Sequence, residues 1–222
     1  MGSLAGITRM LTFAPAQTPR QILLLGAHSD DIEIGCGGTV LQLVEKYPDA
    51  LFIWVVFCSN EMRAKEARAS AEAFLGKDVL RDIRIFSFRD GFLPWLGMEV
   101  KEVFEKIKSD TMPDLIFTHM RDDRHQDHRT LCDLTWNTWR DHAIFEYEIP
   151  KYDGDLGHPN TFVALTAAQA TRKVDYLMEF FGTQRSKRWF TPETFLALMR
   201  LRGIEAGSEM AEAFHTRKFL IG

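Results

Sequence analysis

The chain has 222 residues, of which 45% are apolar and 26% are charged, a composition typical of a folded domain with a substantial core. A net charge of −4 provides no broad basic surface, so a nucleic-acid partner is not expected. Apolar runs such as residues 51–58 are far shorter than the roughly 20 residues that cross a bilayer, so no membrane span is expected either. The start of the chain does not resemble a signal peptide and the three cysteines form no C-x-x-C pair, which favours the cytoplasm.

Short apolar runs alternate with amphipathic stretches along the chain. In chain order, the pattern predicts a strand at 21–26, a helix at 35–46, a strand at 51–58, a helix at 62–75, a strand at 83–88, a helix at 99–108, a strand at 114–118, a helix at 129–140 and a strand at 143–148, followed by helices at 167–181 and 192–202. This alternation predicts an α/β fold with a mostly parallel sheet and helices on both faces. No linker or repeat divides the chain, so residues 20–222 are predicted to form one domain after an N-terminal extension at 1–19.

Two clusters of polar residues fall at the ends of predicted strands. Three residues follow the first strand and three follow the fourth: His28, Asp30 and Asp31, and His125, Asp127 and His128. In a sheet of this kind, ligands bind beyond the carboxyl ends of the strands, where such residues meet. We therefore expect the two clusters to form one site.

These residue types suit hydrolysis assisted by a metal. Two imidazoles and one carboxylate are a common ligand set for catalytic zinc, which keeps its fourth position for water. A further carboxylate can act as the base, and a further imidazole can stabilise an oxyanion. In the second cluster, Asp127 is placed to orient His125. The alternative is that the acidic turn after the first strand only caps the next helix, because Asp is a good N-cap residue.

The two clusters lie in segments that resemble a known family. Residues 27–31 (Ala-His-Ser-Asp-Asp), followed by 35–39 (Gly-Cys-Gly-Gly-Thr), resemble the first signature of the PIG-L/LmbE-like zinc deacetylases, and residues 123–129 resemble the second. That family removes acetyl groups from N-acetylglucosamine-type sugars, free or attached to a carrier, and has a Rossmann-like α/β sheet. The similarity extends to residues 63–66 and to segments near 181–184 and 203–214, so it covers most of the chain from about residue 20 onward.

The resemblance implies a role for each member of the two clusters. The implied ligands of one zinc ion, or of another divalent transition metal, are His28, Asp31 and His128. Asp30 would be the general base. His125 would stabilise the oxyanion or act as general acid, and Asp127 would orient it.

Two further residues are expected to contact substrate. Arg63 corresponds to an arginine that helps to hold substrate in relatives, and Asp90 follows the third predicted strand, where it could bind sugar hydroxyls. The implied reaction is hydrolysis of the N-acetyl group of an acetamido sugar, with a metal-bound water as nucleophile. The alternative is an amidase that cleaves a bulkier acyl amide of a sugar or thiol conjugate. The expected partner is a small-molecule substrate, and enzymes of this kind often form homo-oligomers.

The chain departs from the family pattern at two positions. Ser29 stands where many members have Pro. Ile32 stands where many members have Glu, and the neighbouring Glu33 should not be assumed to take the role of that Glu. A rival hypothesis is a nucleotide-binding module, suggested by the glycines at 35–38. Their spacing does not match Gly-x-Gly-x-x-Gly, and the acidic pair would repel phosphate. The sequence leaves open which carrier the sugar has.

Overall fold

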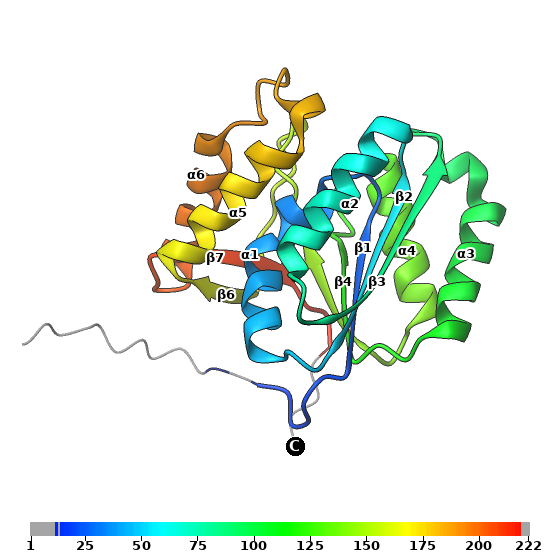
Figure 1. Ribbon diagram of the computed structural model, residues 1–222, viewed down its shortest axis with the longest axis horizontal. Coiled ribbons are helices and arrows are strands. Elements are labelled where there is room, and N and C mark those ends of the chain that lie inside the picture. The colour runs from blue at the N-terminus through cyan, green and yellow to red at the C-terminus, as the bar shows by residue number, and fades with distance from the viewer. Residues whose placement is uncertain (1–11, 13, 219–222) are drawn as a thin grey trace, which may run out of the picture.

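The computed structural model describes residues 12 and 14–218, so residues 1–11 and 13 of the expected N-terminal extension lie outside the described residues. Seven strands in the described part of the chain form one sheet, in the order β3-β2-β1-β4-β5-β7-β6 (Figure 1). In chain order they are β1 (Gln21–Gly26), β2 (Leu51–Cys58), β3 (Leu80–Phe88), β4 (Leu115–His119), β5 (Ala143–Tyr147), β6 (Thr161–Leu165) and β7 (Met210–His215). The first five are parallel, and β7 pairs antiparallel with both β5 and β6.

Helices cover both faces of this sheet. They are α1 (Asp31–Lys46), α2 (Glu61–Leu75), α3 (Gly97–Asp110), α4 (Gln126–Thr138), α5 (Ala167–Phe180) and α6 (Pro192–Glu205), with short 3₁₀ helices η1 (Leu93–Leu96) and η2 (Gly182–Gln184). Side chains of α1, α2, α5 and α6 join one core cluster, whereas those of α3 and α4 join the other. The predicted α/β fold is confirmed. The sequence pattern did not predict β6, β7, η1 or η2. None of the described helices is long and apolar enough to cross a membrane.

The central strand shows why continuous apolar runs predict this sheet. All four residues from Ile22 to Leu25 are fully buried. Ile22 and Leu24 pack in the core cluster under α1 and α2, while Leu23 and Leu25 pack in the cluster under α3 and α4. A parallel strand covered on both faces needs apolar side chains at every position, rather than at every second one.

The strand order changes direction beside β1. The chain adds β2 and β3 on one side of β1 and then returns to place β4 on the other side. The connections that follow β1 and β4 lead away to opposite faces of the sheet. In sheets of this kind, ligands bind beyond the carboxyl ends of two such strands. Both polar clusters follow these strands, so the topology brings them together.

Helix α1, which follows the first cluster, is interrupted inside the protein. Cys36 has non-helical backbone angles (φ −145°, ψ 18°). Beyond the break, the N–H groups of Gly38 and Thr39 donate to the carboxylate of Glu212 on β7, at 2.8 and 2.6 Å. Before the break, Lys173 of α5 donates to an α1 carbonyl oxygen, and it also pairs with Glu212 at 2.6 Å. A buried ion pair from the last third of the chain thus binds the backbone groups that the break leaves free.

One glycine of α1 is required by close packing. A Cβ atom added to Gly35 would lie 2.1 Å from the ring of Tyr147, which is fully buried and donates to the carbonyl of Leu25. We expect Gly35→Ala to lower the free energy of unfolding by about 1–3 kcal/mol, because neither the ring nor the helix can move freely. Urea denaturation measures this change. The control is Gly97→Ala at the start of α3, where a Cβ meets nothing within 4 Å, and this variant should be neutral or slightly stabilised. Equal stability of the two variants would contradict the packing argument.

Candidate active site

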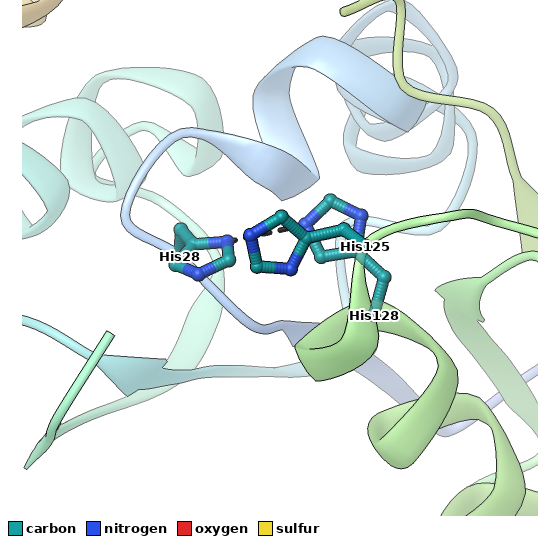
Figure 2. Close-up of side chains that lie close together, drawn as sticks. All are labelled: His28, His125 and His128. Carbon is teal, nitrogen blue, oxygen red and sulfur yellow. Dashed lines mark hydrogen bonds between the residues drawn. The ribbon is translucent and has the colours of Figure 1, made fainter. Parts of the chain in front are cut away.

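The two polar clusters meet at the N-termini of two helices. His28 lies in the turn after β1, and Asp31 is the first residue of α1. His125 is the N-cap residue of α4, and His128 lies in its first turn. Figure 2 shows the rings of His28, His125 and His128 gathered together, although they come from segments about one hundred residues apart. Both helices begin earlier than predicted, so Asp31, Asp127 and His128 are helical rather than in loops. Helix N-termini favour nearby negative charge.

Three side-chain atoms in this site are spaced as metal ligands would be. His28 Nδ1 lies 3.1 Å from His128 Nε2 and 3.2 Å from Asp31 Oδ2, and the latter two atoms are 3.5 Å apart. Ligands in a tetrahedral site with bonds of about 2.0–2.1 Å are about 3.3 Å from one another. Donor atoms of other sets in the same cluster, such as His28, His125 and His128, also lie within 4.8 Å of one another. The arrangement can therefore hold a metal ion.

In both His28 and His128, the ring nitrogen that does not belong to this three-atom group contacts a carboxylate. Nε2 of His28 lies 3.0 Å from Asp90 Oδ1 and 3.3 Å from Asp127 Oδ2. Nδ1 of His128 lies 2.9 Å from Asp123 Oδ2. A carboxylate that accepts from the far nitrogen fixes both the tautomer and the orientation of a histidine ligand. The other nitrogen of each ring is therefore free to bind a metal as part of the three-atom group.

The position of Asp127 corrects one prediction. Its carboxylate was expected to orient His125, but it contacts His28 instead. It also accepts from the backbone N–H groups of Gly91 (2.7 Å) and Leu93 (3.1 Å). Gly91 has a positive φ of 80° here, which glycine adopts without strain. The backbone N–H of Asp127, rather than its side chain, meets His125, donating to Nδ1 at 3.3 Å.

Asp30 forms an ion pair and does not cap a helix. It stands at the N-cap position of α1, but its side chain makes no capping hydrogen bond. Instead, Asp30 Oδ1 accepts from Arg63 Nη2 at 2.6 Å. The alternative that the acidic turn only caps the next helix is therefore wrong for Asp30. Arg63, expected to contact substrate, is held beside it at the start of α2, and its Nε is buried with no partner among the described residues.

The electrostatic environment favours a bound cation. Burial and the nearby His119 lower the pKa of His128 to about 3, so this imidazole is neutral, the form that binds metals. Burial raises the pKa of Asp31, but the surrounding imidazoles outweigh it and hold that pKa well below its usual value. Burial lowers the pKa of His28, but Asp31 and the carboxylates behind it raise it well above its usual value. The carboxylates that raise the pKa of His28 also attract a metal cation.

Other buried polar residues of the site lie outside the two predicted clusters, and of these only His119 was predicted to support the site or to pack beside it. Asp123 was part of the second signature, and its spacing two residues before His125 was the signal that could have identified it. His119, at the end of β4, stacks on His128 with ring centroids 3.8 Å apart, and its Nε2 lies 3.2 Å from Asp31 Oδ2. Glu33 is fully buried, neither of its oxygens has a hydrogen-bond partner within residues 14–218, and burial raises its pKa well above the usual value.

Comparison with solved structures identifies the same fold in proteins of different activity. N,N'-diacetylchitobiose deacetylase from Pyrococcus horikoshii is 18% identical, with a TM-score of 0.63, over 90% of this chain and 84% of that one. The zinc-inhibited form of teicoplanin deacetylase Orf2 is 15% identical, with a TM-score of 0.68, over 88% and 97%. GalB, the 4-carboxy-2-hydroxymuconate hydratase from Pseudomonas putida KT2440, is 15% identical, with a TM-score of 0.71, over 91% and 98%.

These structural similarities establish the fold, and function depends on the site built upon it. The family relationship comes from the sequence itself. The family model described as PIG-L, GlcNAc-PI de-N-acetylase, matches residues 23–139, a range that includes both polar clusters. The chain belongs to the PIG-L family.

Proposed function

We propose that this protein is a zinc-dependent deacetylase that hydrolyses the N-acetyl group of an N-acetylglucosamine-type sugar or sugar conjugate. The spacing of the donor atoms of His28, Asp31 and His128 is the observation that carries the proposal. Membership of the PIG-L family supports it, as do the two structural neighbours that are named as deacetylases.

The three proposed ligands fit zinc in chemistry as well as in spacing. Two imidazoles and one carboxylate are a known catalytic set, and both imidazoles have the carboxylate partners that such ligands need. The chemistry that a bound zinc ion supplies is Lewis acidity, which polarises the acetyl carbonyl and makes water more acidic. The same ligand set disfavours magnesium and calcium, which prefer ligands that are all oxygen.

Asp30 is proposed to accept the proton of the attacking water. Arg63 holds Oδ1, whereas Oδ2 has no hydrogen-bond partner among the described residues. The carboxylate is therefore oriented while one of its oxygens is available for the proton. The protonated Asp30 can then deliver that proton to the leaving amine.

His125 is proposed to stabilise the oxyanion. Because its Nδ1 accepts the backbone N–H of Asp127, the neutral ring carries its proton on Nε2, where it can donate to the developing negative charge. This tautomer favours the oxyanion role over that of general acid. Asp127 contributes its backbone N–H to His125, and its carboxylate holds His28 in place.

Arg63 and Asp90 remain the proposed substrate contacts. The Nε of Arg63 is a donor with no partner in the part of the chain that the structure describes. The side chain of Asp90 is 69% exposed, and one of its oxygens contacts His28. The hydrogen bond from His28 lowers the pKa of Asp90 to about 2, so a carboxylate is present to accept hydrogen bonds from sugar hydroxyls.

Zinc content and acetate release test this function together. We expect the purified protein to hold about one zinc ion per chain and to release acetate from one class among free, nucleotide-linked, thiol-linked and lipid-linked N-acetylhexosamines. Chelation should abolish the activity, and zinc but not magnesium should restore it. Release of a larger acyl group in preference to acetate would favour the alternative amidase. A zinc-loaded protein that hydrolyses none of these amides would contradict the proposal.

A further inference from the structure

A buried lysine lies directly behind the proposed metal ligand His128. Lys151 belongs to the segment that joins β5 to β6, and its Nζ contacts two carboxylates, Asp155 Oδ2 at 2.6 Å and Asp123 Oδ2 at 3.0 Å. The side chains of Lys151, Asp155 and Asp123 are 8%, 4% and 0% exposed. Lysine is almost never buried unless it is paired, so the two carboxylates account for its position.

Both carboxylates are attached to the segment that carries the site. Asp123 Oδ2 contacts Nδ1 of His128 at 2.9 Å, and its Oδ1 accepts the backbone N–H of His125 at 2.8 Å. Asp155 Oδ2 accepts the backbone N–H of Arg124 at 2.7 Å. The segment after β5 is thus joined to residues 123–128 by direct polar contacts, and Lys151 is at their centre.

The charges explain what the ammonium group does there. Both carboxylates contact the same nitrogen atom, so their oxygens are at most two hydrogen-bond lengths apart. Buried like charges at that separation repel one another strongly, and the lysine offsets the repulsion. A buried ion pair is in general weak evidence for net stability, because desolvation cancels much of its attraction. The placement behind His128 therefore points to a role in positioning.

We propose that Lys151 is a positioning residue of the metal centre, which holds Asp123 against His128 and so controls how firmly the protein retains its metal. This inference rests on the proposed function, in which His28, Asp31 and His128 are the ligands. Without the ammonium group, Asp123 and Asp155 repel each other, Asp123 moves away from His128, and the imidazole loses the acceptor that fixes its orientation.

Charge alone predicts the opposite outcome, which makes the test sharp. Removal of a positive charge close to a metal site would strengthen the attraction for a cation. Loss of positioning weakens retention, and loss of an outer partner of a ligand costs about 10–100-fold. We expect zinc-loaded Lys151→Met to release zinc to a chromogenic chelator about tenfold faster than the wild type, at the lower end of that range. If Lys151→Met does not fold, the same zinc-release measurement is made on Lys151→Gln.

A double variant separates positioning from loss of the lysine as such. Lys151→Met combined with Asp155→Asn removes the ammonium group and the repulsion together, so zinc release should return close to the wild-type rate. The control is Arg217→Met, which removes the ion-pair partner of the buried Glu146 and touches no proposed ligand. It should lower the thermal midpoint and leave zinc release unchanged.

The outcomes distinguish this inference from the proposed function. If wild-type protein holds zinc but Lys151→Met releases it at the wild-type rate or more slowly, the positioning role is overturned alone. A double variant that releases zinc as fast as Lys151→Met overturns it as well. A wild-type protein that holds no zinc overturns the proposed metal centre, and this inference with it.

Discussion

Asp30→Asn is expected to lower kcat by about 10²–10⁴-fold while the zinc content of the protein stays at the wild-type level. The amide has the shape of the carboxylate and can still accept from Arg63, which holds Oδ1 at 2.6 Å. It cannot take a proton from water at neutral pH. Asp30 supplies none of the three atoms that are spaced as metal ligands. Asp30→Asn should therefore remove the base and leave the metal in place. Acetate release and metal analysis of the same preparation measure both quantities.

The control for this variant is Asp110→Asn, the same chemical change at the exposed end of α3, which should leave activity unchanged. Two results would contradict the assignment in different ways. Full activity of Asp30→Asn would exclude Asp30 as the base. Loss of zinc from the variant would instead indicate that Asp30 is itself a metal ligand.

The elements that could be predicted are those whose own residues form a clear apolar pattern. β1 and β2 are apolar at nearly every position, because both faces of the sheet are covered, and their bounds were predicted correctly. β7 was missed because Glu212 interrupts its apolar pattern. That side chain is buried only because Lys173 and two α1 N–H groups bind it, and these partners are far away in the sequence.

The site shows the same division. Topology alone brings residues after β1 close to residues after β4, so the sequence could indicate which side chains meet. It could not indicate which atoms pair. Asp127 turns toward His28 because the backbone at Gly91 and Leu93 offers it two N–H groups, and η1, which follows that turn, was not predicted. Lys151 lies in a segment without a recognisable pattern, so its contact with Asp123 was likewise invisible.

Glu212→Gln is expected to lower the free energy of unfolding by about 3–5 kcal/mol, because it leaves the ammonium group of Lys173 buried without a counter-charge. Lys173→Met should cost less. In Lys173→Met, the carboxylate of Glu212 keeps its two backbone donors, Gly38 and Thr39. In Glu212→Gln, the positive charge of Lys173 keeps only one of its partners, a backbone carbonyl oxygen of α1. Urea denaturation of the metal-free proteins measures both values.

The double variant tests whether the pair stabilises α1 through its charge or through the backbone groups it binds. Lys173→Met with Glu212→Gln removes both charges but keeps a side-chain oxygen for an N–H group beyond the break at Cys36, so it should be more stable than Glu212→Gln alone. Replacing Glu212 by Leu in the same background leaves two buried N–H groups without an acceptor, at a cost of about 1–3 kcal/mol each. If the glutamine and leucine double variants were equally stable, the carboxylate would not be needed to complete the interrupted helix. The order we expect makes β7, at the far end of the chain, a support for the helix that begins with Asp31.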